Sequence, residues 1–511
     1  MSTRGAVVLI GFMGAGKTTT ARKLAAVRGQ RVHDVDHLIE ARAGLPIAEL
    51  FTRDGEPAFR ALEEELVCEL LANVGAGDLV SMSGGAVGSA RVRDALRAHL
   101  TVWLDVDVAL AWRRASGGHR PLAHDREAFV ALHARRASLY AELANAIVPG
   151  AARDALPRAF DAVEQLRAAP VGTRLLWAVT HSAEYPVWIG RGLLGSDVWP
   201  LPRPSSRRFC VTDRNVAALW AAALGAREGD VVIAPGEGSK SLAGAEHVWS
   251  ALAALGVTRA DHLAALGGGV VGDLAGFCAA TYQRGIAVVH VPTTLAAQVD
   301  SAYGGKTAID LPAAKNYVGA FHQPAGVVVD PATLATLPPA EQGAGYAEVL
   351  KTALIAGGSL WQRIADDAPI DDRVITDCIR CKLAIVAADE HDDGRRQVLN
   401  LGHTVGHAIE TATGYTRYRH GEAVGLGLLA ALELSGQDEL RAQVAGLLAS
   451  HGLPTHSDGL DPAAVVAASQ RDKKRFGASV PFVLVDAPGD VRHGAAVDPA
   501  RLEAAVEALC R

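Results

Sequence analysis

The sequence predicts an α/β protein built from two successive α/β halves, the second of which ends in a long helical part. Short apolar runs precede glycine-rich loops at two places, AVVLI before GFMGAGKT and LAAL before GGGVVGD. Strand signals alternate with helical stretches after both, which is typical of parallel sheets covered by helices. After about Pro331 the strand signals nearly vanish, and Ala/Leu-rich stretches predict helices to residue 511.

A chain of 511 residues is too long for one hydrophobic core, and its length alone suggests about three domains. The amphipathic stretch DALPRAFDAVEQLRA closes the first α/β pattern, and a short break follows it. The boundaries that we expect are a first α/β domain over 1–168, a link over 169–174, a second α/β part over 175–331 and an all-helical part over 332–511.

Composition excludes several classes of function. The net charge of −6 gives no global basic field, so we expect no nucleic-acid partner. Six scattered cysteines do not make a disulfide framework, and we interpret Cys378 and Cys381 as ordinary helix residues. No apolar run reaches the roughly 18 residues of a membrane span. We therefore expect a cytoplasmic protein with no membrane partner.

The first glycine-rich loop fits the phosphate-binding P-loop pattern, Gly11-x4-Gly16-Lys17-Thr18. Its backbone N–H groups turn onto phosphate oxygens, Lys17 reaches the β and γ phosphates, and the Thr18 hydroxyl holds Mg²⁺. The strand before the loop and the helix after it supply the required context. The pattern predicts an ATP–Mg²⁺ site at Gly14, Ala15, Gly16, Lys17, Thr18 and Thr19.

Charged residues elsewhere in the first half suggest an acceptor for the phosphoryl group. DVD, with Asp34 and Asp36, follows a likely strand, and arginines stand at 60, 120 and 136. Each arginine alone is more simply a solvated surface charge. Together with SGGAV, residues 83–87, the pattern resembles shikimate kinase over nearly all of residues 5–168.

This resemblance implies a role for each residue. Asp34 would act near Mg²⁺ and Asp36 on the acceptor hydroxyl, while Gly84 and Gly85 would lie against the substrate ring. Arg60 and Arg136 would clamp the shikimate carboxylate, and Arg120, on a lid over about 114–125, would reach the transferring phosphate. The sequence departs from the family in two places: Ser83 replaces a glycine, and the lid is about one residue short. Another small-metabolite kinase of the same fold, or a regulatory ATP-binding module, is the alternative.

The second half holds histidines and a glutamate in a pattern that predicts a metal site. His403 and His407 in LNLGHTVGHAIE are four residues apart, which places both imidazoles on one helix face. His420 follows in RHGEAVG, and Glu348 and Lys351 share a helix face in GYAEVLK. A catalytic site of the zinc type needs about three protein ligands, and one shared site explains these residues better than separate surface positions.

These stretches, with GGGVVGDLAGF, VPTTLAAQVDSAYGGKTAID and KNYVGAFHQP, resemble 3-dehydroquinate synthase over about 175–500. The resemblance implies Glu348, His403 and His420 as ligands of Zn²⁺ or Co²⁺, with His407 handling protons. It also implies a Rossmann-like α/β NAD part, a helical metal part and a homodimer. The family converts 3-deoxy-D-arabino-heptulosonate 7-phosphate to 3-dehydroquinate and phosphate, and its NAD⁺ is used catalytically without net reduction.

The resemblance assigns two further sets of residues. The substrate pocket would be lined by Lys306, Asn316, Lys351, Lys382, Arg396, Asn400 and Lys474, with Arg284 reaching the phosphate across the dimer interface. Among these, Lys306, Lys351 and Asn400 would act in catalysis. The NAD⁺ surroundings would be Asp213, Glu237, Lys240, Gly268, Gly269, Asp273, Thr293, Thr294, Asp300, Lys306, Lys315 and Thr336.

Two alternatives remain for the second half, a metal-dependent polyol dehydrogenase and a cyclase acting on a related sugar phosphate. Several convergent cations favour an anionic substrate, because unpaired buried lysines are costly. A kinase-like first half makes a cyclase of secondary metabolism less favoured than a shikimate-pathway enzyme. The two resemblances together predict a bifunctional shikimate-pathway enzyme.

Overall fold

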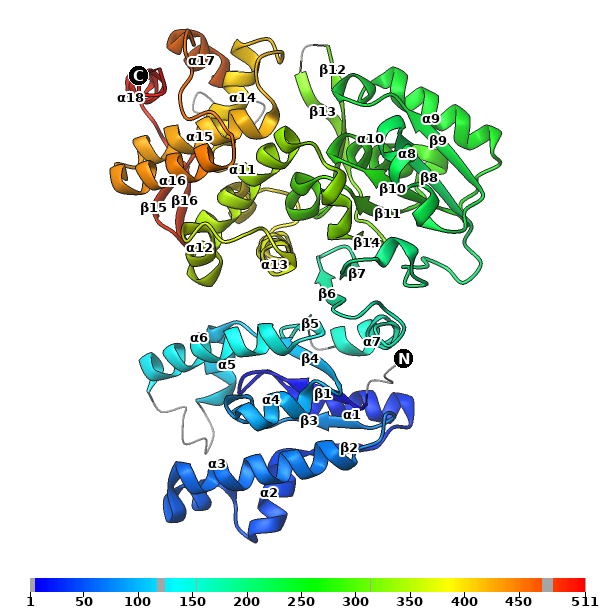
Figure 1. The fold of residues 1–511 in the computed structure, drawn as a ribbon, viewed down its shortest axis with the longest axis vertical. Coiled ribbons are helices and arrows are strands. Elements are labelled where there is room, and N and C mark those ends of the chain that lie inside the picture. Colours follow the sequence, from blue (N-terminus) through cyan, green and yellow to red (C-terminus); the bar gives the residue numbers. More distant parts are fainter. Residues whose placement is uncertain (1–4, 117–124, 153, 313, 471–480, 511) are drawn as a thin grey trace. The chain divides into compact units, whose positions relative to one another are not determined.

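The computed structural model describes residues 5–116, 125–152, 154–312, 314–470 and 481–510. The chain divides into two compact units, Met1–Val179 with Glu184–Pro200, and Thr180–Ala183 with Leu201–Arg511. Each unit combines strands and helices, which confirms the predicted α/β class (Figure 1). No helix in the described part of the chain is both long enough and apolar enough to cross a membrane.

The first unit is built on a sheet whose first six strands are parallel. The strand order is β2 (Val32–Asp34), β3 (Leu79–Ser81), β1 (Val7–Ile10), β4 (Leu100–Asp105), β5 (Ala146–Pro149), β6 (Arg174–Val179) and β7 (Glu184–Ile189). Only β7 runs antiparallel to its neighbour. The carboxyl ends of β1, β2 and β3 therefore meet at one edge of the sheet, where ligands bind in open α/β sheets.

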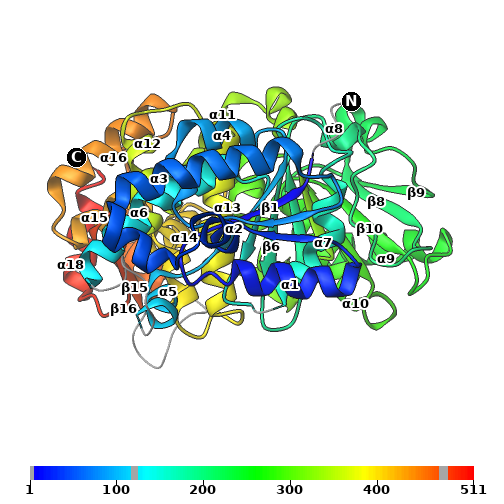
Figure 2. The same cartoon turned by 90° about the horizontal axis from the view of Figure 1, so that it is seen from below.

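Helices cover both faces of this sheet. They are α1 (Lys17–Arg28), α2 (Val35–Ala43), α3 (Ile47–Asn73), α4 (Ala90–Leu96), α5 (Val108–Ala115), α6 (Arg126–Leu143) and α7 (Ala155–Gln165). Figure 2 shows α1 on one side of the strands and α3 with α4 on the other. The helix α3 is kinked at Gly55, whose φ of 78° and following Pro57 interrupt regular helical geometry.

The second unit begins with a five-stranded parallel sheet. Its order is β14 (Gly326–Val329), β11 (Ala287–Pro292), β10 (His262–Gly267), β8 (Arg208–Asp213) and β9 (Gly229–Ile233). Beside the sheet lie α8 (Arg214–Trp220), α9 (Leu242–Ala254) and α10 (Gly269–Thr281), and an antiparallel hairpin forms from β12 (Lys306–Leu311) and β13 (Ala314–Phe321). Buried apolar residues of β8, β10, β11, α9 and α10 form the core of this part.

The rest of the second unit is mostly helical, as predicted. Its helices are α11 (Pro339–Ala356), α12 (Gly358–Ala365), α13 (Asp372–Ala388), α14 (His403–Ala412), α15 (His420–Leu434), α16 (Asp438–Ser450), α17 (Pro462–Ser469) and α18 (Pro499–Glu507). The expectation of an all-helical part needs one correction. An antiparallel hairpin of β15 (Phe482–Ala487) and β16 (Asp490–Ala495) lies before α18, because the apolar run FVLV pairs across a turn at Gly489, whose φ is 91°.

The compact units divide the chain at a different place from the expected domain boundaries. Strands β6 and β7 are grouped with the first unit, because β6 pairs with β5. Spatial grouping does not assign function, so the boundaries at 168, 174 and 331 stay predictions.

Helices α14 and α15 pack unusually closely, and glycines make this possible. A Cβ atom added at Gly427 would lie 2.0 Å from the carbonyl oxygen of Gly402, and one at Gly406 would lie 3.1 Å from that of Ala423. These helices begin with His403 and His420, so their separation also sets the distance between the two imidazoles.

Gly427→Ala is therefore expected to destabilise the second unit by about 1–3 kcal/mol, because the added methyl forces the two helices apart. Calorimetric melting of the full chain measures this. The matched control is Gly446→Ala on α16, where an added Cβ meets nothing within 4 Å. That change is expected to leave stability equal or raise it by about 0.5–1 kcal/mol. Equal melting of the two variants would contradict the packing argument.

Candidate active sites

The P-loop of the first unit has the backbone that its glycines predict. Gly11, Gly14 and Gly16 have φ values of 144°, 82° and 89°, a region that side-chain-bearing residues rarely adopt. The Lys17 ammonium lies at this loop and donates to the carbonyl oxygens of Gly11 at 2.8 Å and Phe12 at 3.2 Å. Ala15 lies buried in the loop, and Thr18 and Thr19 follow in the first turn of α1.

The carboxyl ends of β2 and β3 bring further oxygen atoms to the same edge of the sheet. Thr18 Oγ1 lies 3.2 Å from Ser81 Oγ at the end of β3. Asp34 caps α2 by accepting from the His37 backbone N–H at 3.4 Å, while its Oδ2 atom is buried without a hydrogen-bond partner among the described residues. A buried carboxylate oxygen of this kind fits a cation such as Mg²⁺. Asp36 is exposed in the first turn of α2.

Arg60 and Arg136, predicted to clamp a carboxylate, lie near each other and near the Gly84–Gly85 backbone. Arg60 on α3 lies so close to Gly85 that a Cβ atom there would be 1.9 Å from Arg60 Nη1. Burial, together with the charge of nearby Arg60, lowers the pKa of Arg136 on α6. Tyr140, one turn along α6, donates to the carbonyl oxygen of Gly84 at 2.6 Å. Two arginines beside a glycine backbone suit a flat anionic substrate. Arg120 and most of the expected lid lie outside the described residues.

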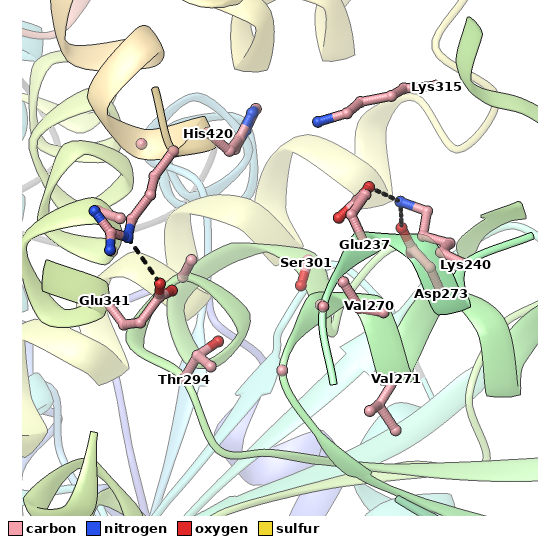
Figure 3. A pocket seen from close by; sticks show the side chains of 18 of the residues that line it. Glu237, Lys240, Val270, Val271, Asp273, Thr294, Ser301, Lys315, Glu341 and His420 are labelled. Atoms are coloured by element: carbon pink, nitrogen blue, oxygen red, sulfur yellow. Dashed lines mark hydrogen bonds and ion pairs between the residues drawn. The ribbon is translucent and has the colours of Figure 1, made fainter. Parts of the chain in front are cut away.

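A cavity of about 1020 Å³ opens in the second unit between its sheet and its helices (Figure 3). Every residue predicted to surround NAD⁺ lines it except Lys306: Asp213, Glu237, Lys240, Gly268, Gly269, Asp273, Thr293, Thr294, Asp300, Lys315 and Thr336. Asn316 and the four residues of the predicted metal site, Glu348, His403, His407 and His420, line it too. The cavity is large enough for a dinucleotide or for a substrate beside one.

The sheet side of this cavity offers features that fit a dinucleotide. The helix α10 begins at Gly269, directly after β10, so its first N–H groups face the end of the strand. A Cβ atom at Gly268 would lie 2.8 Å from Thr294 Cγ2, so a larger residue there would have to move the Thr294 side chain. Lys240 is buried and pairs with Asp273 at 2.8 Å and Glu237 at 3.4 Å. These contacts fix three polar side chains at the cavity wall.

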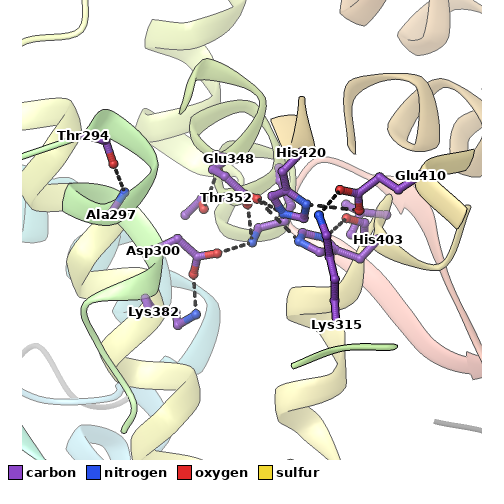
Figure 4. A network of polar contacts seen from close by, with 12 residues as sticks. Thr294, Ala297, Asp300, Lys315, Glu348, Thr352, Lys382, His403, Glu410 and His420 are labelled. Atoms are coloured by element: carbon purple, nitrogen blue, oxygen red, sulfur yellow. Dashed lines mark hydrogen bonds and ion pairs between the residues drawn. The ribbon is translucent and has the colours of Figure 1, made fainter. Parts of the chain in front are cut away.

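The helical side of the cavity gathers the predicted metal ligands (Figure 4). Glu348 Oε1 lies 3.4 Å from Nε2 of His403 and 3.4 Å from Nε2 of His420. One ligand atom from each of His403, His407 and His420 lies within 4.8 Å of the others. Burial opposes the charge of Glu348, but Lys351 and His403 outweigh it and keep the pKa of this carboxyl well below its usual range. One carboxylate and two or three imidazoles suit Zn²⁺ or Co²⁺, and which imidazoles ligate stays a prediction.

Buried lysines form ion pairs with the carboxylates in and next to this cluster. Lys351, 1% exposed, pairs with Glu348 Oε2 at 2.6 Å and with Asp300 Oδ2 at 2.8 Å. Lys382 from α13 pairs with the other oxygen of Asp300. The two lysines keep the pKa of Asp300 low, at about 2, against the effect of burial.

Some residues predicted for the substrate pocket lie away from the cavity wall. Arg396 is buried, and its guanidinium donates to the carbonyl oxygens of Glu390 and of Gly304, the latter at 2.9 Å. Lys306 is exposed and pairs with Asp392. Arg284 lies on an exposed turn with a φ of 70°, and Asn400 ends a 3₁₀ turn before α14. Lys474 lies outside the described residues.

The sequence analysis gave no role to Glu410, which the structure places in the same cluster. Its buried carboxylate accepts from Lys315 Nζ at 3.1 Å and lies 3.4 Å from Nδ1 of His420. One carboxylate therefore touches both a predicted NAD⁺ contact and a predicted metal ligand. Its place in the motif, one turn beyond His407, was the available signal.

Comparisons with known proteins agree with both predicted resemblances. Residues 230–344 and 345–475 match the family models for the N-terminal and C-terminal parts of 3-dehydroquinate synthase, and residues 13–167 match that for shikimate kinase. The 3-dehydroquinate synthase of Symbiobacterium thermophilum is 42% identical over 353 residues, which cover 64% of this chain and 98% of that protein. The chain belongs to the 3-dehydroquinate synthase family. Within that family it carries a shikimate kinase domain ahead of the synthase.

Solved structures of two further synthases share the fold of the second unit. The 2-epi-5-epi-valiolone synthase of Streptomyces hygroscopicus, solved with NAD⁺ and Zn²⁺ bound, is 25% identical, with a TM-score of 0.59, and the match covers 65% of this chain and 98% of that one. A 2-deoxy-scyllo-inosose synthase complexed with carbaglucose-6-phosphate, NAD⁺ and Co²⁺ is 24% identical, with a TM-score of 0.58 and coverage of 65% and 99%. The likeness to the second shows the fold alone.

Glu410→Gln is expected to weaken Zn²⁺ or Co²⁺ binding about 10- to 100-fold, the usual cost of losing a carboxylate behind a metal-binding histidine. Titration against a chromophoric chelator measures the affinity, and the visible absorption of bound Co²⁺ reports the ligand geometry. The control is Glu439→Gln, an exposed glutamate on α16. If both variants bind metal as tightly as the unaltered protein, Glu410 does not orient His420.

Proposed function

We propose that the chain is a bifunctional shikimate-pathway enzyme with two separate active sites. The first unit phosphorylates shikimate with ATP and Mg²⁺ to give shikimate 3-phosphate and ADP. The second converts 3-deoxy-D-arabino-heptulosonate 7-phosphate to 3-dehydroquinate and phosphate, with NAD⁺ and Zn²⁺ or Co²⁺. The observation that carries the proposal is the presence, in one chain, of a P-loop beside two arginines and of a Glu–His cluster beside a dinucleotide-sized cavity.

In the kinase site the protein mainly positions charges, as phosphoryl transfer requires. The P-loop amides and Lys17 would hold the ATP phosphates, and Thr18 and Asp34 would hold Mg²⁺. Arg60 and Arg136 pair with the acceptor carboxylate, which places a ring hydroxyl near Asp36. The carboxylate of Asp36 accepts the proton of that hydroxyl as the phosphoryl group arrives.

In the synthase site, Glu348, His403 and His420 would hold the metal, and Gly268, Gly269 and the first turn of α10 would hold the dinucleotide phosphates. When bound, the metal supplies a Lewis acid for the substrate hydroxyl, and NAD⁺ supplies a reversible hydride acceptor. His407 stands beside the two other imidazoles and handles protons. Lys351 keeps the Glu348 carboxylate charged, and Lys315 brings a cation to the substrate.

A net polyol dehydrogenase is the competing function for the second unit, and the family match speaks against it. The chain is 42% identical to a 3-dehydroquinate synthase and covers 98% of that protein. The buried lysines Lys240, Lys351 and Lys382 are paired with carboxylates of the chain itself, so their burial requires no anionic substrate. The alternative of a cyclase on a related sugar phosphate is weaker for the same reason, because identity to the valiolone synthase is only 25%.

We further propose that the enzyme works in the cytoplasm as a homodimer formed through the synthase unit. Exposed apolar side chains gather on the hairpin of β12 and β13, where Leu311, Tyr317, Val318 and Phe321 are 37–60% exposed. Arg284, expected to reach the partner's substrate, is also exposed. A second copy of the chain would remove this apolar surface from water.

Two single changes are expected to separate the two activities. Lys17→Met should lower ADP formation with shikimate about a hundredfold or more, because the phosphates lose their cation. Glu348→Gln should lower phosphate release from the heptulosonate phosphate by a similar factor, because the metal loses its charged ligand. Each variant is expected to keep the other activity, so each is the control for the other. Sustained NADH build-up during the second assay would favour the dehydrogenase instead.

Val318→Glu is expected to shift the protein toward monomers, because a charge on the β12–β13 hairpin would have to be buried in the dimer. Light scattering during gel filtration measures the mass. The matched control is Val130→Glu on α6 of the first unit, where valine is 45% exposed. A dimer of unchanged stability in both variants would place the interface elsewhere.

A further inference from the structure

Glu63 on α3 is a buried carboxylate whose two oxygens have different partners. Its side chain is only 3% exposed, and Oε2 accepts from Arg60 Nη1 at 2.6 Å. Oε1 accepts from the hydroxyl of Ser83 at 2.6 Å. A buried carboxylate is costly unless both oxygens are satisfied. The Ser83 hydroxyl therefore fixes the orientation of Glu63, and Glu63 fixes one edge of the Arg60 guanidinium against Gly85.

The other edge of the same guanidinium has a weaker partner. Arg60 Nε and Nη2 both reach a single oxygen of Glu56, at 3.2 Å and 3.0 Å. The Glu56 side chain is 50% exposed, and ion pairs in such surroundings contribute little. This edge presents two N–H groups in the fork geometry that binds a carboxylate with both oxygens. Glu56 thus occupies the place that an anionic ligand needs.

We propose that Ser83 is a positioning residue for the acceptor carboxylate, and that Glu56 is a resting partner that this carboxylate displaces. The Ser83–Glu63 pair holds Arg60 in place throughout, so binding exchanges one exposed carboxylate for another. The proposal deepens the proposed kinase function and rests on it. It also gives a physical role to the hydroxyl that distinguishes this glycine-rich loop.

The chain contains a matched arrangement outside the site. Ser89 donates to Glu64 at 2.7 Å, and Arg91 donates to the other oxygen of Glu64 at 2.7 Å. In this second set Glu64 lies on α3, one residue along from Glu63, whereas Ser89 and the exposed Arg91 belong to the start of α4. Ser89 also caps α4 by accepting from the Val92 N–H at 3.3 Å, so Ser89→Ala reports what losing a serine hydroxyl does to stability outside the predicted site.

The experiment measures steady-state kinetics of the full chain with shikimate and ATP, with shikimate binding measured by calorimetry. Ser83→Ala is expected to raise KM and Kd for shikimate about fivefold to tenfold while KM for ATP stays the same, since one buried hydrogen bond to a charged group is lost. Ser83→Thr, which keeps the hydroxyl, is expected to restore most of the affinity. Ser89→Ala is expected to lower the melting temperature without changing either KM.

Glu56→Gln tests the exchange. Removing the competing charge is expected to lower KM for shikimate about twofold to fivefold, a free-energy change of the size that exposed ion pairs have. The control is Glu69→Gln. Glu69 lies on α3, as Glu56 does, and it is the exposed ion-pair partner of Arg42 on α2. An increase in KM for shikimate in Glu56→Gln would overturn the displacement, because Glu56 would then support Arg60 and not compete for it.

The outcomes separate this inference from the proposed function. If the unaltered chain phosphorylates shikimate and Arg136→Ala raises its KM, the function stands. Should Ser83→Ala then leave KM for shikimate unchanged, or change both KM values equally, the positioning role is wrong. No phosphorylation of shikimate by the unaltered chain would overturn the kinase function, and the inference with it.

Discussion

The synthase site depends on the burial of a lysine ammonium between two carboxylates. Lys351 is almost completely enclosed, and its charge is tolerable only because Glu348 and Asp300 lie within hydrogen-bonding distance. Asp300 comes from a π-helical turn that follows β11, whereas Glu348 and Lys351 come from α11. The ion pairs therefore join the sheet part of the second unit to its helical part. The same contacts keep Glu348 charged, and a charged carboxylate is what a divalent cation needs.

Both units place chemistry at the carboxyl ends of parallel strands, and close backbone approach makes this possible. In the first unit the P-loop follows β1, and Gly84 and Gly85 follow β3, so both glycine-rich loops lie at one edge of the sheet. In the second unit α10 follows β10 directly, with Gly268 between them packed against the Thr294 side chain. Close backbone approach also occurs between the helices α14 and α15. Glycines at their contact let the helices pack closely, so His403 and His420, the first residues of the two helices, lie near each other.

Local patterns allowed much of this to be predicted from sequence. The P-loop, the α/β class and the histidine pair depend on residues close together in the sequence, and such residues are also close together in the folded chain. Contacts between distant segments were harder to predict. Glu410 meets Lys315 across 95 positions, and Ser83 meets Glu63 across 20. The motif placed Glu410 near the histidines, but no local spacing indicated its contact with Lys315 or the contact of Ser83 with Glu63. The hairpin of β15 and β16 was missed because a short apolar run fits a buried helix segment as well as a strand. Arg396 matched a family motif, but its guanidinium lies on backbone carbonyl groups, which spacing alone does not show.

Asp300 divides its two oxygens between lysines of two different helices. Loss of the aspartate would leave two like charges facing each other in an enclosed space, and loss of either lysine would leave a carboxylate short of a counter-charge. With Glu348, which also pairs with Lys351, the cluster holds two positive and two negative charges. No single loss among the four keeps this balance, so the four residues are expected to be inherited together. Descendants of this enzyme that acquire a new substrate would have to do so around these four fixed side chains.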